Sequence, residues 1–103
     1  MTERNHSPQL SKPQAKKILE AAAADSSRVH FSEHAFFRME EREITATQVL
    51  RILGTGQITE GPVWSVPHGS WELTVRGFDS GAVVTLPVAI EQDQTGVIIV
   101  TVF

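Results

Sequence analysis

The sequence has 103 residues, of which 12 are acidic and nine are basic, so its formal net charge is -3, and it contains no cysteine. This length suits one domain whose hydrophobic core needs no metal or disulfide, and the missing cysteine excludes disulfides and thiolate sites. The net acidity argues against a general electrostatic affinity for nucleic acid, which is typical of basic domains.

The first ten residues and the apolar runs of the sequence indicate in which compartment the protein is found. Residues 1–10 are polar and predict a flexible tail ahead of a single domain over residues 11–103. They have no apolar stretch of the kind found in signal peptides, and the longest apolar run, residues 97–100, is too short to span a bilayer. We therefore expect a cytoplasmic protein with no membrane partner.

A first helix is predicted near the start of the domain. Ser11 and Gln14 have the spacing of a capping box, and Pro13 lies in the first turn of the helix that would follow. Apolar residues at helical spacing extend this helix over about residues 12–24. Residues 28–31 then have the composition of a short strand.

Two more helices are expected to follow as a tight pair. Ser32 can cap the first of them, and Glu33 in its first turn complements the positive end of the helix dipole. Thr45 and Gln48 form a second capping box, so a new helix should begin at about residue 46. Gly54 is expected to end that helix.

The second half of the chain has the pattern of strands. Extended segments are expected at residues 57–60, 63–66, 71–76, 82–91 and 97–103. Pro87 predicts a bulge or an edge position in its strand. The last three segments are joined by short polar turns, which is typical of an antiparallel meander. Because helices come first and strands second, we predict an α+β fold with N-terminal helices packed on a small antiparallel β-sheet.

The second predicted helix concentrates the residues that could perform chemistry. His34, Arg38 and Arg42 are spaced four apart, so on a helix their side chains form one slanted stripe. An imidazole can transfer a proton near neutral pH, and guanidinium groups bind phosphate with forked geometry. Cleavage of RNA by transesterification needs these two functions, so we assign all three as candidate catalytic residues.

Two further residues are candidates for substrate binding. Arg76 lies on the polar face of its predicted strand and could converge on the same phosphate. His68, in the turn before that strand, is a second candidate for proton transfer. No metal or other cofactor is expected, because His30 and His34 lack the glutamate of a zinc-binding H-E-x-x-H motif.

The same residues allow other interpretations. The stripe is interleaved with Glu40, Glu41 and Glu43, so its arginines could instead be ion-pairing residues on a solvated helix face. A different function is a non-catalytic protein-binding module. Segment 82–91 has apolar residues on both faces and the chain ends on the apolar Phe103, so an exposed sheet edge there could pair with a partner.

The segment that contains the stripe carries a family resemblance. Residues 31–44 read F-S-E-H-A-F-F-R-M-E-E-R-E-I. They resemble a bacterial family of small domains of unknown function, whose signature is S-x-H-A-x-x-R-M-x-x-R-x-I. Residues 56–58 and 97–102 resemble the glycine-led strand and the C-terminal strand of the same family, so the resemblance covers about residues 28–103. Glu43 departs from it, because glycine usually follows the second arginine.

That family is similar to a branch of the RelE and MqsR toxin superfamily, whose fold packs helices on a small antiparallel sheet. The resemblance implies a toxin of a type II toxin–antitoxin pair, which cleaves mRNA, free or on the ribosome, without a metal. A cognate antitoxin protein would be its partner. His34, Arg38 and Arg42 match the family signature residue by residue, so the resemblance implies that they act on the RNA.

Overall fold

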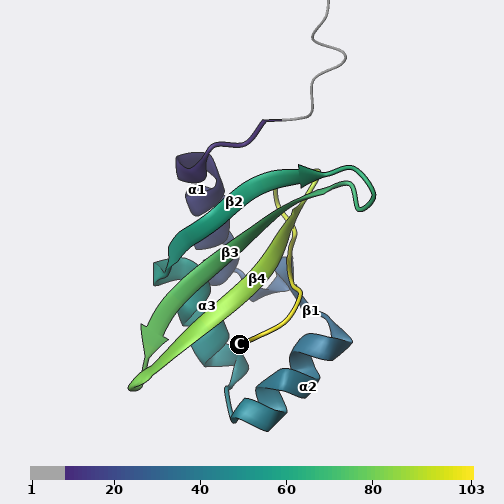
Figure 1. Ribbon diagram of the computed structural model, residues 1–103. Helices are drawn as coiled ribbons and strands as arrows, with labels where there is room; N and C mark the ends of the chain where they lie inside the picture. The colour runs from purple at the N-terminus through teal and green to yellow at the C-terminus, as the bar shows by residue number, and fades with distance from the viewer. Residues whose placement is uncertain (1–8) are drawn as a thin grey trace, which may run out of the picture.

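The computed structural model describes residues 9–103. Within this range, three α-helices, one 3-10 turn and five strands follow one another. Their bounds are α1 (Lys12–Ala24), η2 (Ser26–Arg28), β1 (Val29–Phe31), α2 (Glu33–Arg42), α3 (Ala46–Thr55), β2 (Gln57–Ser65), β3 (Ser70–Asp79), β4 (Ala82–Glu91) and β5 (Val97–Ile99). The strands form one sheet in the order β1-β5-β4-β3-β2 (Figure 1). The predicted α+β class is confirmed.

The sheet is mixed because one edge pair is parallel. The pairs β2–β3, β3–β4 and β4–β5 are antiparallel, which confirms the predicted meander. Strand β1 pairs with β5 in parallel, with Val29 opposite Val97. The sequence did not predict this parallel pair, because a three-residue strand carries little local signal and its partner lies at the other end of the chain.

The helix starts predicted from the sequence are confirmed. Ser11 and Gln14 form a capping box ahead of α1, and Thr45 and Gln48 form another ahead of α3. Ser32 caps α2 through its side chain. Each of these signals is confined to residues three apart, so it does not depend on the rest of the fold.

The end of α3 differs from the prediction. Gly54 lies inside the helix, which continues to Thr55 and is capped by Gly56. The Lys16 ammonium of α1 donates to the carbonyl oxygens of Gly54 and Gly56, at 3.1 and 2.6 Å. A cation at this position satisfies carbonyls that have no partner within the helix and complements the helix dipole. The contact with Lys16 is made where α3 extends one residue, Thr55, beyond the predicted end at Gly54.

Strand β2 joins two segments that were predicted separately. It runs without a break through Gly61 and Pro62, with irregular pairing to β3 on either side of Glu60. Gly61 has a φ of 79°, and a Cβ atom there would lie 2.5 Å from the carbonyl oxygen of Glu72. Only glycine fits such a close approach, which lets the strand bend without ending.

The hydrophobic core lies between one face of the sheet and helices α1 and α3. In Figure 1 these helices pass behind the strands, and no helix lies in front of them. The core side chains alternate along the strands and line one face of the helices; they include Ala15, Leu19, Ala22, Val49, Ile52, Leu53, Trp71, Leu73, Val75, Val84, Leu86, Val88 and Ile90. Leu10 is also buried, although it falls in the predicted tail. Residues 1–8 of that predicted tail lie outside the described residues.

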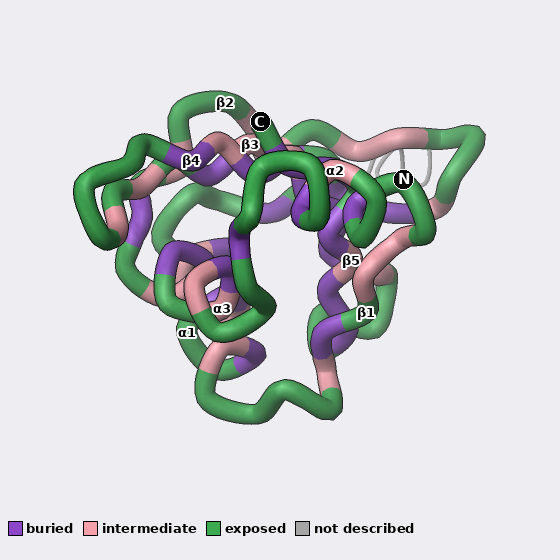
Figure 2. Tube along the Cα trace, turned by 90° about the horizontal axis from the view of Figure 1, so that it is seen from below, coloured by how far each residue is buried: buried purple, intermediate pink, exposed green. Residues whose placement is uncertain are grey.

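Helix α2 occupies a different place from the other two helices. It lies across one end of the molecule, beside the C-terminal segment, and most of its surface is exposed (Figures 1 and 2). Ala35 and Met39 point inward and are buried, whereas Phe36 and Phe37 are exposed. None of the helices within residues 9–103 is long and apolar enough to cross a membrane.

Pro87 lies in an interior strand, opposite an irregular segment of its neighbour. On the β5 side, Val88 pairs with Ile99. Further along, Thr85 and Phe103 exchange two backbone hydrogen bonds of 2.9 and 2.8 Å, one residue out of that register. Strand β4 therefore has neither the bulge nor the edge position predicted for Pro87: Pro87 pairs regularly with Thr74 of β3, and the irregular residues lie in the chain on its other side. Strand β5 ends at Ile99, and the pairing of the chain with β4 resumes at Phe103.

Candidate functional site

Ser32 attaches helix α2 to the C-terminal segment. Its hydroxyl accepts a hydrogen bond from the backbone N–H of Ala35 at 2.9 Å and donates one to the carbonyl of Val100 at 2.7 Å. Its own backbone N–H donates to the carbonyl of Ile99 at 3.0 Å. One residue therefore caps the helix and fixes the helix along residues 99–103.

Arg38 makes a second attachment in the middle of the helix. Its Nε donates to the carbonyl oxygen of Val102 at 3.2 Å, and its Nη1 lies 3.5 Å from a carboxylate oxygen of Glu41. The guanidinium carbon lies 5.4 Å from the centre of the Phe103 ring, which is a cation–π arrangement. Arg38 is therefore held in place from three sides, and its Nη2 has no hydrogen-bond partner among the described residues.

His34 and Arg42 lie one helical turn to either side of Arg38. Four residues of helix advance by about 6 Å, so the three side chains follow one another along α2 at that spacing. Both His34 and Arg42 are exposed, and neither forms a hydrogen bond or ion pair with another residue of the range 9–103. The ion-pair interpretation thus applies to Arg38 and Glu41 but not to the two ends of the stripe.

Phe103 connects this helix to the open face of the sheet. It is paired with Thr85 of β4, and Thr85 is paired with Arg76 of β3. Directly paired residues share a face, and neighbouring strands are about 4.8 Å apart, so the backbones of Phe103 and Arg76 are about 10 Å apart. Arg76 is exposed and has no ion-pair partner in the described part of the chain. Arg38 therefore contacts Phe103, and Arg76 lies two strands from Phe103 on the same face of the sheet.

These residues form one surface from three parts of the chain. We call it the basic surface and define it as His34, Arg38, Arg42, Arg76 and Phe103. Four of its members were predicted as site residues. The stacking of Arg38 on Phe103 was not predicted, because the register of the C-terminal segment against β4 cannot be read from either segment alone.

His68 lies apart from the basic surface. It is in the turn between β2 and β3, and its Nδ1 is 3.0 Å from a carboxylate oxygen of Glu72 and 3.1 Å from the Ser65 hydroxyl. Strand β3 separates this turn from Arg76, since Ser70 to Arg76 spans about 20 Å at 3.3 Å per residue. The structure therefore does not bring the two predicted substrate-binding residues together, and His68 is too far away to act on the same phosphate.

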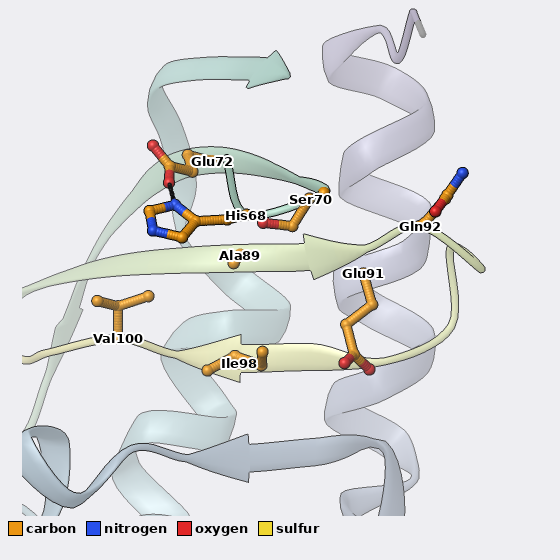
Figure 3. Close-up of a pocket in the computed structure, with 9 residues that line it drawn as sticks. His68, Ser70, Glu72, Ala89, Glu91, Gln92, Ile98 and Val100 are labelled. Atoms are coloured by element: carbon orange, nitrogen blue, oxygen red, sulfur yellow. Dashed lines mark hydrogen bonds and ion pairs between the residues drawn. The ribbon is translucent and has the colours of Figure 1, made fainter. Parts of the chain in front are cut away.

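A cavity of about 570 Å³ lies next to His68 on the open face of the sheet. Figure 3 shows Glu72 bonded to His68 on one side of it and Glu91 on another, with Ala89 and Ile98 between them. No residue of this cavity except His68 was predicted as functional. The alternation of β3, which places Glu72 on the same face as Arg76, is the one signal in the sequence that could have indicated it.

We searched the described residues for a cluster of side chains that could bind a metal ion. Among residues 9–103, no three His, Asp or Glu side chains gather closely enough to hold a metal ion.

The comparisons with known proteins give a family but no function. The family described as "Domain of unknown function (DUF4258)" matches residues 31–103. No curated protein and no solved structure matches the chain. The matched region starts immediately ahead of α2 and ends with Phe103, so the whole basic surface lies within it, whereas α1 precedes it.

Proposed function

We propose that this chain, which belongs to the DUF4258 family of domains of unknown function, is a metal-independent endoribonuclease that cleaves mRNA at its basic surface. The observation that carries the proposal is the fixed position of Arg38. It is held by Val102 and Phe103, with the His34 imidazole one helical turn before it and the Arg42 guanidinium one turn after it, both without a hydrogen-bond or ion-pair partner among residues 9–103. A preorganised cation beside a proton-transfer group suits phosphoryl transfer.

The chemistry needs no group beyond these side chains. The 2′-hydroxyl of the RNA attacks the adjacent phosphorus while the His34 imidazole takes its proton. Arg38 and Arg42 stabilise the negative charge that develops on the phosphoryl oxygens. The bond to the 5′ oxygen then breaks, and that oxygen takes a proton from water. The products are a 2′,3′-cyclic phosphate and a 5′-hydroxyl end.

The rest of the basic surface is suited to a single strand. The Phe103 side chain is 51% exposed, so part of its ring can stack on an unpaired base. Arg76, about 10 Å away on the open face, is placed to contact a neighbouring phosphate. The chain is acidic overall, yet its one basic residue after position 53 lies on this surface. RNA affinity would thus come from a local concentration of cations.

The biological role that we propose is the toxin of a type II toxin–antitoxin pair. It rests on the resemblance of residues 31–44 to a family of small domains of unknown function, which is itself similar to a branch of the RelE and MqsR toxin superfamily. The cognate antitoxin would neutralise the enzyme by covering the basic surface, and mRNA would be the substrate.

The test is cleavage of a labelled single-stranded RNA by the purified chain in the presence of EDTA, which removes contributions from metal-dependent nucleases. We expect fragments ending in a 2′,3′-cyclic phosphate, and His34→Ala should lower the rate by about 10²- to 10⁴-fold. His30→Ala is the matched control, because His30 is an exposed histidine on β1 without a partner among the described residues. Absence of cleavage by the wild type, or equal activity of His34→Ala and His30→Ala, would refute the proposal.

A further inference from the structure

We infer that the open face of the sheet carries a second functional surface, a docking groove for a basic amphipathic helix of a partner protein. The groove runs along β3 from Ser70 to Thr74 and stops short of Arg76, which lies two residues further along the same face. It is distinct from the basic surface, and the inference holds whether or not the chain cleaves RNA.

The groove consists of two adjoining hollows. One is the cavity of about 570 Å³ beside His68, and the other has a volume of about 380 Å³. The two share Glu72 and Val100 in their walls, so they form one depression. From Ser70 to Thr74 it extends about 13 Å along β3, which is close to the length of two helical turns.

The floor of the groove is apolar and is not covered by any described element. It includes Val63, Pro87, Ala89, Ile98 and Val100. Val63 and Val100 are 64% and 42% exposed, Pro87 and Ile98 are half-buried, and Ala89 is buried. Exposed apolar residues such as Val63 and Val100, on the uncovered face of a sheet, are typical of a surface that binds another molecule.

Three carboxylates lie around this floor, and none of them is paired with Lys or Arg in the described part of the chain. Glu60, Glu72 and Glu91 line the groove, whereas no Lys or Arg does. Glu60 accepts a hydrogen bond from the Thr74 hydroxyl at 3.3 Å, and a carboxylate oxygen of Glu72 lies 3.0 Å from Nδ1 of His68. Carboxylates that no Lys or Arg neutralises, above an apolar floor, favour a ligand that presents Lys or Arg beside apolar side chains.

Ser70 adds a polar group to the wall of the larger hollow (Figure 3). Its hydroxyl forms no hydrogen bond with the described residues and is not one of the fully buried unpaired atoms, so it is open to the hollow. A polar group of the bound segment can bond to it.

Three kinds of ligand would fit the shape of the groove, and the negative charge of its carboxylates distinguishes between them. A nucleic acid would bring phosphates to three carboxylates, which is repulsive. A second copy of this chain would bring a net charge of -3 to the same place. A helix with lysines flanking leucines matches both the apolar floor and the acidic rim, and its length suits the groove.

The inference can be tested by titrating the ¹⁵N-labelled full chain with two synthetic helical peptides and recording amide shifts by NMR. Both peptides carry the same leucine positions, but one has lysine and the other glutamate on its polar face. We expect the lysine peptide to shift amides of residues 63, 72, 89, 98 and 100, and the glutamate peptide to leave them unchanged.

A pair of variants tests whether the carboxylates of the groove cause the preference for the lysine peptide. Glu60→Gln combined with Glu72→Gln should weaken binding of the lysine peptide by at least about fivefold. Glu20→Gln is the control, because Glu20 is an exposed carboxylate on α1, behind the sheet. Amide spectra of the free variants verify that each is folded. Equal binding of both peptides, shifts centred outside the groove, or equal affinities of the double variant and the control would overturn the inference.

Discussion

The guanidinium carbon of Arg38 lies 5.4 Å from the centre of the Phe103 ring. The same side chain donates to the carbonyl of Val102, a residue 64 positions further along the chain. These contacts make helix α2 and the C-terminal segment a single structural unit. Arg38 therefore serves the fold and the basic surface at once, and its replacement should affect both.

Substitution of Arg38 by lysine tests this double role. Lysine keeps the charge but cannot donate to Val102 and stack on Phe103 with the same planar group. We expect Arg38→Lys to lower RNA cleavage at least about tenfold and to lower the free energy of unfolding by about 1 kcal/mol. Rates on labelled RNA and urea denaturation provide the two measurements.

Arg51→Lys is the matched control for this substitution. Arg51 pairs with Asp79, away from α2, and its side chain is 57% exposed. Its replacement should leave cleavage unchanged. If Arg38→Lys cleaves RNA as fast as the control does, the preorganisation of Arg38 is unimportant for function.

Glu43 is held in a backbone conformation that favours glycine. It follows the last residue of α2 with φ 55° and ψ 45°, in the left-handed region. A side chain costs about 1 kcal/mol there relative to glycine. We therefore expect Glu43→Gly to raise the free energy of unfolding by up to about 1 kcal/mol, as measured by chemical denaturation.

The control for this prediction is the same substitution one turn earlier. Glu40→Gly places glycine inside α2, where it should lower the free energy of unfolding by about 1 kcal/mol. Opposite signs for two Glu→Gly changes on one helix would identify the backbone conformation as the cause. Destabilisation by both would show that Glu43 has a contact that outweighs its strain.

Gly77 permits close packing between β3 and α3. A Cβ atom at this position would lie 2.8 Å from the Cγ2 atom of Ile52, which is fully buried. We expect Gly77→Ala to lower the free energy of unfolding by about 1 to 3 kcal/mol through overpacking. In a double-mutant cycle with Ile52→Ala the combined cost should be smaller than the sum of the single costs. Strict additivity would contradict the clash.

Asp93 links stability to acidic pH. The backbone N–H groups of Thr95 and Gly96 donate to its carboxylate and lower the pKa of Asp93 below its ordinary value. The charged form is favoured in the folded chain, so its stabilising effect is present above about pH 4 and is lost as the pH falls through the lowered pKa.

The measurement compares the melting temperatures of the wild type and Asp93→Ala at several pH values. The wild type should melt higher at pH 6, and the difference should shrink as the pH falls below about 4. Glu20→Ala serves as a control, because Glu20 makes no hydrogen bond or ion pair with residues of the described structure. A difference that does not depend on pH would contradict the proposed linkage.

The sequence by itself determined the elements whose signals are local. Capping boxes place both partners within three residues, so the starts of α1 and α3 could be predicted. Alternation along β3 depends only on the two-residue period of a strand and correctly predicted that Trp71, Leu73 and Val75 face the core. The stripe of His34, Arg38 and Arg42 follows in the same way from the helical period.

Only the tertiary structure decided where these elements meet. The parallel pairing of β1 with β5 and the bond from Ser32 to Val100, 68 residues later, depend on contacts between distant segments. For the same reason the sequence could not show that Arg38 stacks on Phe103 or that His68 lies far from Arg76. Local periodicity determines which face of an element a residue occupies, whereas packing of the whole chain determines what that face touches.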